Sequence, residues 1–405
     1  MGLTRRRLLA TAGGAAGALA FGGGGYALGR EEGGDPEAVP FYGPRQAGIA
    51  TPAQDRLVFG AFDVVAGSRG ELRALLQHWT AAAARMTAGE LTGAAAEQPD
   101  APPADTGEAL GLKPAKLTIT FGLGPGVFDG RFGLTSLRPA PLRELDALPG
   151  DFLEPARSGG DLCVQACSDD PQVAFHAVRN LTRLGRGSVE LRWLQLGFGR
   201  TSSTTSGQST PRNLMGFKDG TNNIKSDDRK AMDRSVWVGD DEPQAWLRGG
   251  TYLVARRIRM LIETWDRSSL SDQEHTFGRR KTSGAPLNGA HEHDTVDLVA
   301  RQGDGTLVIP ANAHIRLAGP GANGTRILRR GYSYTDGIDP VTGQLDAGLF
   351  FVCFQRDPHS QFAEIQRRLG RRDALNEYIR HTGSAIFAVP PGTSRGGYVG
   401  EALFG

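Results

Sequence analysis

The sequence predicts an α+β protein made of two tandem units, each an antiparallel β-sheet with helices packed on one face. Two pairs of strand–helix segments that echo each other carry this prediction. Residues 160–184 read GDLCVQACSDDPQVAFHAVRNLTRL and residues 347–369 read AGLFFVCFQRDPHSQFAEIQRRL. An Asp-Pro pair stands between strand and helix in both, at Asp170 and at Asp357. The chain therefore repeats one structural unit.

A second echo supports the repeat. Residues 60–79 and 249–265 both run strand, turn and helix, and both close on tryptophan, at Trp79 and Trp265. Neither shows the βαβ pattern of a dinucleotide-binding sheet. We place the boundary near Gly207, which gives an N-terminal domain over residues 55–206 and a C-terminal domain over residues 207–405.

The elements of the first unit follow in order. RLVFGAFDVVA at 56–66 is an apolar run that predicts a strand, and RGELRALLQHWTAAAARM at 69–86 predicts a helix. The segment 87–114, rich in Ala, Pro, Glu and Gly, predicts the longest surface loop. KLTITFGLG at 116–124 alternates as a strand does, and the strand–helix unit at 160–184 follows.

Composition favours a soluble globular protein and gives no sign of a nucleic-acid binder. The 405 residues are 39% hydrophobic and 22% charged, and 46 basic residues nearly balance 44 acidic ones without a long basic block. Cys163, Cys167 and Cys353 are too few for a disulfide framework, so we expect buried free thiols. No CxxCH motif is present, which excludes covalent c-type haem attachment by pattern.

The N-terminus predicts a twin-arginine export signal over residues 1–30, followed by a linker over residues 31–54. Arg5, Arg6 and Arg7 precede a weakly apolar Ala/Gly/Leu stretch whose glycines argue against a membrane anchor, although an uncleaved tether stays open. The twin-arginine export machinery is then a partner, and the expected location is extracellular, periplasmic or in the cell envelope. This route carries folded proteins, often with a cofactor already bound.

Among the eight histidines, His314 stands apart. His78, His176 and His359 lie in helix-like or turn segments among charges, where a solvated or capping histidine is expected. The pair in HEHD at 291–294 lacks the further ligands of a zinc site. His314 begins the short apolar segment HIRLA, and Arg329 follows 15 residues later in RRGYSY.

A carboxylate between two glycines is the other candidate. NLMGFKDGTNNI at 213–224 places Asp219 just before Gly220 in a segment with little regular periodicity. A tight turn explains most Asp-Gly pairs. A functional role for Asp219 therefore depends on the rest of the chain.

Together these motifs resemble the dye-decolourising peroxidases, in particular their twin-arginine-exported bacterial branch. The motifs that carry the resemblance are QAGIATP at 46–52, LTITFGLGP at 117–125, GDLCVQAC at 160–167, GFKDGTNN at 216–223, TFGRRK at 276–281, HIRLA at 314–318 and RRGYSY at 329–334. The resemblance implies two ferredoxin-like domains and one non-covalent haem b per chain, held mainly by the second domain. It maps the proximal iron ligand to His314, the signature carboxylate to Asp219 and the distal arginine to Arg329.

These residue types suit peroxide chemistry. A neutral imidazole is a strong axial ligand, a carboxylate can move a proton between the peroxide oxygens, and a guanidinium stabilises the departing oxygen. Arg330 could in principle take the place of Arg329, because consecutive residues of an extended segment face opposite sides. We follow the family pattern and choose Arg329.

Two further roles at the haem, a cation for the propionates and an acceptor for the proximal histidine, each have more than one candidate. Haem propionates need cations, for which Arg279 comes first and Arg280 second, with a solvated loop as the alternative. The acceptor for the other ring N–H of the proximal histidine is Glu377, with Asp373 and a backbone carbonyl as rivals.

The expected function is reduction of hydrogen peroxide coupled to one-electron oxidation of organic donors such as dyes and phenols. Large donors call for oxidation at the surface, for which the candidates are Trp237, Trp246, Trp265, Tyr332 and Tyr334. The alternative is a haem-handling or iron-acquisition component of an exported ferrous-iron uptake system. A chlorite-dismutase-like activity shares the general fold but would not explain GFKDG. The oligomeric state, a homo-oligomer included, stays open.

Overall fold

The computed structural model describes residues 35–94, 99–321 and 324–405. The predicted export signal over residues 1–30 lies outside the described residues, as does the start of the predicted linker. Within the described ranges, no helix combines the length and the apolar character needed to cross a bilayer.

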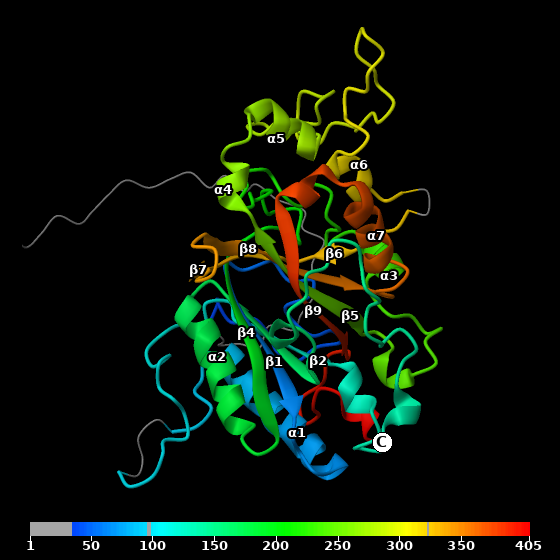
Figure 1. Ribbon diagram of the computed structural model, residues 1–405. Helices are drawn as coiled ribbons and strands as arrows, with labels where there is room; N and C mark the ends of the chain where they lie inside the picture. Colours follow the sequence, from blue (N-terminus) through cyan, green and yellow to red (C-terminus); the bar gives the residue numbers. More distant parts are fainter. Residues whose placement is uncertain (1–34, 95–98, 322–323) are drawn as a thin grey trace, which may run out of the picture. The chain divides into compact units, whose positions relative to one another are not determined.

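The first half of the chain forms the ferredoxin-like βαββαβ unit that the sequence predicts. Its elements are β1 (Arg56–Val64), α1 (Arg69–Thr87), β2 (Thr118–Leu123), β3 (Leu162–Ser168), α2 (Pro171–Leu184) and β4 (Val189–Arg200). The strands lie in the order β2-β3-β1-β4 and all neighbours are antiparallel. Helices α1 and α2 pack beside each other against this sheet (Figure 1).

The second half repeats the same topology. Its four main strands are β5 (Thr251–Met260), β7 (Tyr332–Ile338), β8 (Leu345–Gln355) and β9 (Ile379–Val389), in the antiparallel order β9-β5-β8-β7. Helices α4 (Ile262–Trp265) and α7 (Phe362–Arg372) stand where α1 and α2 stand in the first half. The second half also contains α3 (Arg229–Ser235), α5 (Leu270–Phe277), α6 (His314–Ala318) and the short strand β6 (Leu328–Arg329). Both sequence echoes therefore mark equivalent strand–helix units.

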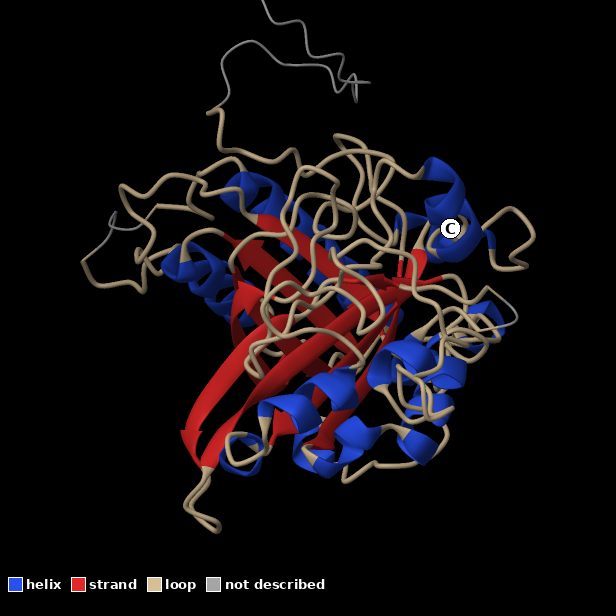
Figure 2. Ribbon diagram, turned by 90° about the horizontal axis from the view of Figure 1, so that it is seen from above, coloured by secondary structure: helices blue, strands red, loops and turns tan. Residues whose placement is uncertain are grey.

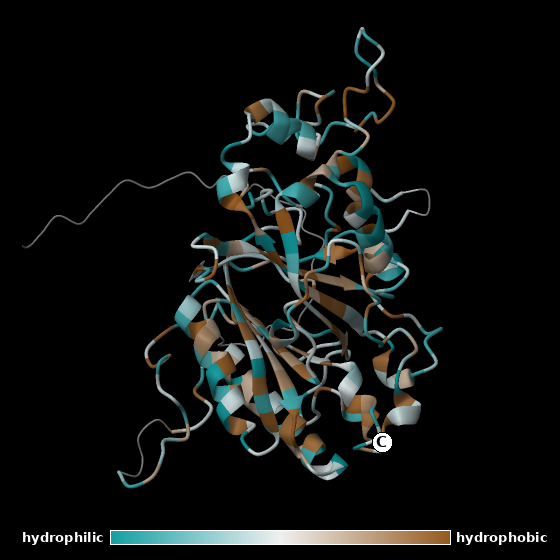
Figure 3. Ribbon diagram, in the orientation of Figure 1, coloured by the Kyte–Doolittle hydropathy of each residue, from teal (hydrophilic) through white to brown (hydrophobic). Residues whose placement is uncertain are grey.

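The two sheets join at both edges. Strand β4 pairs with β7 and β2 pairs with β9, and because β5 pairs with β8 within the second sheet, the strands close around a common interior. Figure 2 shows the strands in red with helices on both sides of them. Phe59, Phe350 and Phe387 meet there and are almost fully buried. Figure 3 shows hydrophobic residues along the strands, whereas the helices carry both hydrophobic and hydrophilic residues.

Capping residues set the starts of α1 and α2. Ser68 accepts a hydrogen bond from the backbone N–H of Glu71, and the Glu71 carboxylate accepts from the N–H of Gly67 in return. Asp170 caps α2 by accepting from two backbone N–H groups, with Pro171 at the first helical position. These short-range patterns explain why the sequence predicted both helices well.

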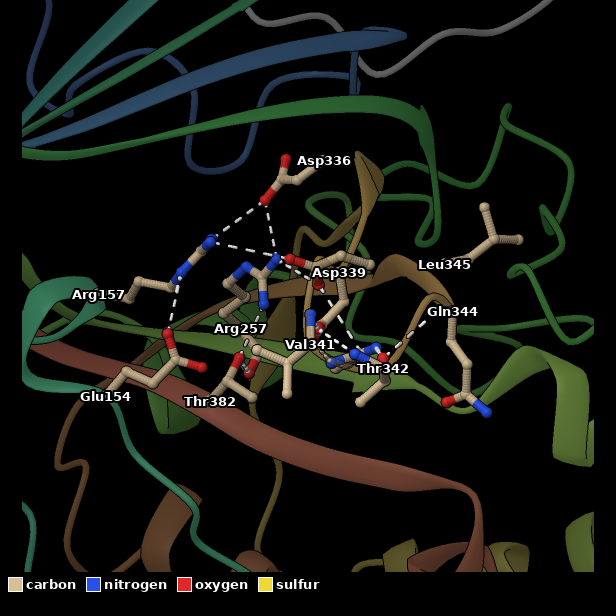
Figure 4. Close-up of polar contacts among 12 residues, drawn as sticks. Glu154, Arg157, Arg257, Asp336, Asp339, Val341, Thr342, Gln344, Leu345 and Thr382 are labelled. Atoms are coloured by element: carbon tan, nitrogen blue, oxygen red, sulfur yellow. Dashed lines mark hydrogen bonds and ion pairs between the residues drawn. The ribbon is translucent and has the colours of Figure 1, made fainter.

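A polar network ties the first half to the second (Figure 4). Arg157, from the loop before β3, lies 3.2 Å from the Asp336 carboxylate, and Arg257 of β5 lies 2.8 Å from the same carboxylate. Glu154 holds Arg157 on its other side at 3.1 Å. Asp346 accepts from Arg257 at 2.7 Å, so the buried guanidinium is shared between two carboxylates.

Two predictions about polar side chains have different outcomes. Cys163, Cys167 and Cys353 are buried and free, as expected. His176 is not solvated: it is 2% exposed, and its Nε2 lies 2.9 Å from the buried Asp105 carboxylate. The sequence places Asp105 in a loop 71 residues earlier, and only the fold brings the two together.

Candidate functional site

A cavity of about 610 Å³ lies in the second half of the chain, within the usual range for ligand pockets. Strands β5, β8 and β9 form one wall, and helices α6 and α7 form another. Apolar side chains dominate the lining of the cavity, among them Phe277 of α5, Leu349 and Phe351 of β8, and Phe362 and Leu369 of α7. Asp219, Arg279, His314 and Arg329 also line the cavity, so the structure brings together four of the five predicted site residues.

His314 is the first residue of α6, and its ring is held from one side. Its Nδ1 lies 2.6 Å from Oδ2 of Asp373, whose side chain is only 2% exposed. The Oδ1 atom of Asp373 accepts from the N–H of Leu375, which fixes the carboxylate. With Nδ1 donating to Asp373, the lone pair of Nε2 is available to a metal.

Charge around His314 favours a basic imidazole. Burial alone would lower the pKa of His314, but the charge and hydrogen bond of Asp373 outweigh burial and raise the pKa. Asp219 acts in the same direction, and Arg329 opposes it. This is the electrostatic setting of a strong axial ligand.

The assignment of Glu377 as the acceptor for His314 is wrong, because Asp373, its rival, holds that position. Asp373 caps the short 3₁₀ helix Ala374–Glu377 and faces α6. Glu377 ends the same short helix, is exposed and does not line the cavity. Residues 373 and 377 belong to one polar turn, so the sequence alone could not tell which carboxylate points inward.

Asp219 and Arg329 form an ion pair elsewhere in the cavity wall. Nη1 of Arg329 lies 3.0 Å from Oδ1 of Asp219, and the two side chains are 26% and 15% exposed. Nδ2 of Asn213 donates to the other oxygen of Asp219 at 3.2 Å. Both carboxylate oxygens are therefore held by hydrogen-bond donors while the group keeps access to the cavity.

The backbone of Arg329 is fixed as firmly as its side chain. Asn223 accepts from the N–H of Arg329 at 2.8 Å and donates to its carbonyl at 2.9 Å. Arg330 faces the other way: it is 0% exposed and donates to the carbonyl of Thr51 at 2.6 Å. The alternation expected of an extended segment thus separates the two arginines.

The GFKDG segment is a turn, and it still presents a carboxylate to the cavity. The N–H of Asn213 donates to the carbonyl of Phe217, and Gly216 and Gly220 have φ angles of +84° and +80°. A side chain at Gly220 would press against Ser202, with its Cβ 3.1 Å from Cα of that residue. Glycine is needed there for both conformation and space.

Arg279 lines the cavity, whereas Arg280 does not. The Arg279 guanidinium donates to the carbonyls of Gly284 at 2.6 Å and Glu292 at 3.0 Å. Burial lowers its pKa, and the nearby Glu292 opposes that effect. Arg280 is 53% exposed and pairs with Glu274. Of these two arginines, only Arg279 is placed to meet an anion in the cavity.

Two further expectations can be compared with the structure. The five aromatic candidates for surface oxidation are all buried, at 9% exposure or less, so none offers a large face to a bulky donor. His291 and His293 are exposed, and the described part of the chain contains no group of three His, Cys, Asp or Glu residues that could hold a metal ion.

Sequence reasoning missed Asn213, Asn223 and Glu292 as residues of the site. Asn213 and Asn223 lie at the two ends of the stretch that contains Asp219. Asn-x-x-Gly is a turn signal, and a turn that returns to its start brings the asparagine amide to the carboxylate. Glu292 offered no comparable signal, since it lies in a long segment without periodicity.

The cavity fits haem b on the chemistry of its walls. An imidazole with a free Nε2 supplies an axial ligand, apolar side chains suit the porphyrin faces, and Arg279 supplies a cation for a propionate. Asp219 and Arg329 supply a polar pair for the reacting ligand of the iron.

Comparison with known proteins agrees with this fit. The family model of the Dyp-type peroxidase N-terminal domain matches residues 46–199, and that of the C-terminal domain matches residues 210–394. The deferrochelatase of Escherichia coli strain K12 is 40% identical over 376 residues, which cover 91% of this chain and 87% of the relative.

Solved structures give the same result. A DyP-type peroxidase from Streptomyces coelicolor and ferric DtpA from Streptomyces lividans each have 43% identity and a TM-score of 0.83, covering 91% of this chain and 97% of theirs. A DyP-type peroxidase from Cellulomonas bogoriensis is 41% identical with a TM-score of 0.81, covering 91% of this chain and 98% of its own. The chain is a haem-dependent peroxidase and belongs to the Dyp-type peroxidase family.

Proposed function

We propose that the chain reduces hydrogen peroxide in this cavity and takes the electrons, one at a time, from organic donors such as dyes and phenols. One observation carries the proposal: the same cavity is lined by an imidazole backed by a buried carboxylate and by a carboxylate–guanidinium pair. The first arrangement suits an iron ligand, and the second suits the handling of a peroxide.

His314 would hold the haem iron through Nε2, and Asp373 would keep the ring in the tautomer that leaves Nε2 unprotonated. Haem b supplies the redox chemistry when it is bound. Arg279 would pair with a propionate, because its buried guanidinium faces the cavity and donates there to the backbone carbonyls of Gly284 and Glu292. These residues bind and orient the cofactor.

Asp219 would accept a proton from one oxygen of hydrogen peroxide and return it to the other oxygen, which leaves as water. Arg329 would stabilise the negative charge that develops on the leaving oxygen, and its ion pair with Asp219 holds the two side chains together. Asn213 holds the second oxygen of Asp219, so the carboxylate starts from one defined orientation.

A second candidate function is haem handling for iron acquisition, favoured by the name deferrochelatase that the curated relatives carry. The same cavity and the same His314 would serve it. The chemistry differs in its product, because a peroxidase oxidises a donor and leaves the haem intact, whereas iron acquisition yields free iron and a metal-free porphyrin.

We further infer that the chain is exported by the twin-arginine machinery with its haem already bound. The support is Arg5, Arg6 and Arg7 before a weakly apolar segment. The protein would then act outside the cytoplasm, in the periplasm, the cell envelope or the medium.

Product analysis tests the choice between the two functions. The haem-loaded protein is mixed with hydrogen peroxide and a phenolic donor, and both the oxidised donor and the porphyrin are measured. The peroxidase function is supported if each haem oxidises many donor molecules and the haem spectrum is restored afterwards. Stoichiometric release of iron with a metal-free porphyrin and little donor oxidation would contradict it.

A further inference from the structure

A long segment without helices or strands of its own covers one side of the cavity. Residues 287–309, here called the flap, lie between α5 and α6 and appear in yellow beside these helices in Figure 1. It contains one isolated β-bridge, between Arg301 and Leu307. Six consecutive or nearly consecutive flap residues line the cavity: Glu292, His293, Asp294, Thr295, Val296 and Leu298.

The base of the flap is fixed to the helix that begins with His314. Arg316 donates to the carbonyls of Leu298 at 2.7 Å and Ile309 at 2.8 Å. Leu287, Ile309 and Ala313 form a small apolar cluster, against which Ile315 packs. The base therefore combines hydrogen bonds from a guanidinium to backbone carbonyls with apolar burial.

Between the two base residues Leu287 and Leu298, the flap is held to the opposite cavity wall mainly through one residue, Glu292. Its carboxylate forms an ion pair with Lys218 and accepts from the hydroxyl of Thr221 at 3.0 Å. Its backbone carbonyl accepts from Arg279 at 3.0 Å. Lys218 and Thr221 flank Asp219 in the sequence, so one flap residue contacts both the turn that carries Asp219 and the cation predicted for a propionate.

The environment of Glu292 suits a strong contact. Its side chain is 11% exposed and that of Lys218 is 26% exposed, so the pair is shielded more than a surface ion pair. Burial, the largest single effect, would raise the pKa of Glu292, but the hydrogen bonds from Lys218, Thr210 and Thr221 and the charge of Lys218 together outweigh it, and the pKa is lowered. The carboxylate is thus charged at neutral pH, and a neutral replacement would lose most of the attraction.

We propose that the flap is the gate through which haem enters and leaves, and that Glu292 is its latch. The proposal rests on the proposed function, since it requires haem in this cavity. When the carboxylate of Glu292 leaves Lys218 and Thr221, the part of the flap between Leu287 and Leu298 moves away from the cavity wall and opens the cavity, while the base at Arg316 stays in place. Glu292 acts here as a positioning residue that controls the lifetime of bound haem.

If Glu292 acted only through its charge, its removal would slow haem loss. Removing its negative charge makes the rim around Lys218 and Arg279 more positive, which would hold anionic propionates more tightly and slow haem loss. A latch predicts faster loss, because a barrier to opening is removed. The sign of the change therefore separates the two roles.

The test measures haem transfer from the loaded protein to excess apomyoglobin, followed in the Soret region. Glu292→Gln should transfer haem on the order of tenfold faster than the parental protein, as expected for loss of a hydrogen bond between charged groups. Thr221→Val keeps the charge and the shape while removing one bond, and it should transfer haem about threefold faster. Glu90→Gln, which breaks an exposed ion pair with Arg85 on α1, is the matched control and should leave the rate unchanged.

Three results would overturn the latch. These are an unchanged or slower rate in Glu292→Gln, an unchanged rate in Thr221→Val, or an equal acceleration in Glu90→Gln. Thr221→Val keeps the test valid if Glu292→Gln folds poorly. Failure of the parental protein to bind haem would overturn the proposed function itself, which is a separate outcome visible before any variant is made.

Discussion

The Nδ1 atom of His314 lies 2.6 Å from the Oδ2 atom of Asp373, although 59 residues separate them in the chain. The contact joins the first residue of α6 to the turn that follows α7, and α6 and α7 pack against each other. It fixes both the orientation and the protonation of the ring. The site therefore depends on how these two helices pack as much as on the histidine itself.

His314→Ala should abolish stable haem loading, because no other described histidine lines the cavity with a carboxylate on its Nδ1. The measurement is the haem content and Soret position of the purified variant after reconstitution. His291→Ala is the control, since His291 is exposed and outside the cavity wall. A His314→Ala protein with parental haem content and an unchanged Soret band would show that the ligand is elsewhere.

Asp373→Asn should leave haem bound but raise the reduction potential of the iron. The carboxylate makes the imidazole a better donor, which favours the ferric state, and an amide does so less. The expected rise is roughly 60 mV for each tenfold loss of ferric preference. Spectroelectrochemical titration measures it. Glu377→Gln, on the same turn but exposed, is the control and should keep the parental reduction potential. If Glu377→Gln shifted the potential more than Asp373→Asn does, Glu377 would be the hydrogen-bond partner of His314.

His381 predicts a pH dependence of stability. Burial, followed by the charge of Arg256, lowers its pKa from 6.5 to about 3, so the folded protein keeps it neutral. The unfolded chain binds a proton on this group below about pH 6.5, and stability is therefore lost as pH falls from 6.5 towards 3. The slope is about 1.4 kcal/mol per pH unit.

Replacing His381 should remove its contribution to the pH dependence of stability. In denaturant titrations of the haem-loaded protein between pH 7 and pH 5, His381→Gln should lose less stability than the parental protein, by about 2 kcal/mol at pH 5. The exposed His291→Gln serves as the comparison. Parallel pH profiles for the parental protein and His381→Gln would mean that His381 is protonated in the folded state.

Export gives a prediction that lies outside the described residues. Replacing Arg5 and Arg6 with lysine should leave active, haem-loaded protein inside the cell, because the twin-arginine machinery requires the arginine pair and moves folded proteins. Cell fractionation with haem and activity assays on each fraction measures this. Normal export of the variant, or export through the route for unfolded chains alone, would show that the signal was misread.

The fold could be predicted from the sequence because its evidence is local and repeated. Strand alternation, the Asp170-Pro171 start of α2 and the two echoes each report on neighbouring residues, and the same pattern appears twice. The closing of the two sheets at β2–β9 and β4–β7 left no such signal. It depends on edge pairings between strands far apart in the chain.

The site also contains residues that the sequence could predict and residues that it could not. His314, Asp219 and Arg329 stand in short motifs, and the structure gathers all three around one cavity. Asp373 and Glu377 share one polar turn, and only packing against α6 decides which of them faces inward. The contacts of Glu292 with Lys218 and Thr221 span more than 70 residues and have no sequence pattern at all.

The pairing of Asp219 with Arg329 leads to the most direct test. Asp219→Asn keeps shape and polarity but removes the base, and Arg329→Leu removes the charge that stabilises the leaving oxygen. Loss of a positioned acid–base group costs about 10²–10⁴-fold, and loss of a charge-stabilising donor costs about 10²–10³-fold. Both variants should keep their haem, and Arg329→Leu should be the more damaged, because water can replace a carboxylate more readily than a guanidinium.

The measurement is stopped-flow absorption of each haem-loaded protein mixed with one equivalent of hydrogen peroxide, across the acidic to neutral pH range. The parental Soret band should change rapidly and recover when a donor is added, while both variants should react at least about a hundredfold more slowly. If both variants react with peroxide at the parental rate throughout this range, Asp219 and Arg329 are not the catalytic pair, and GFKDG is only a turn.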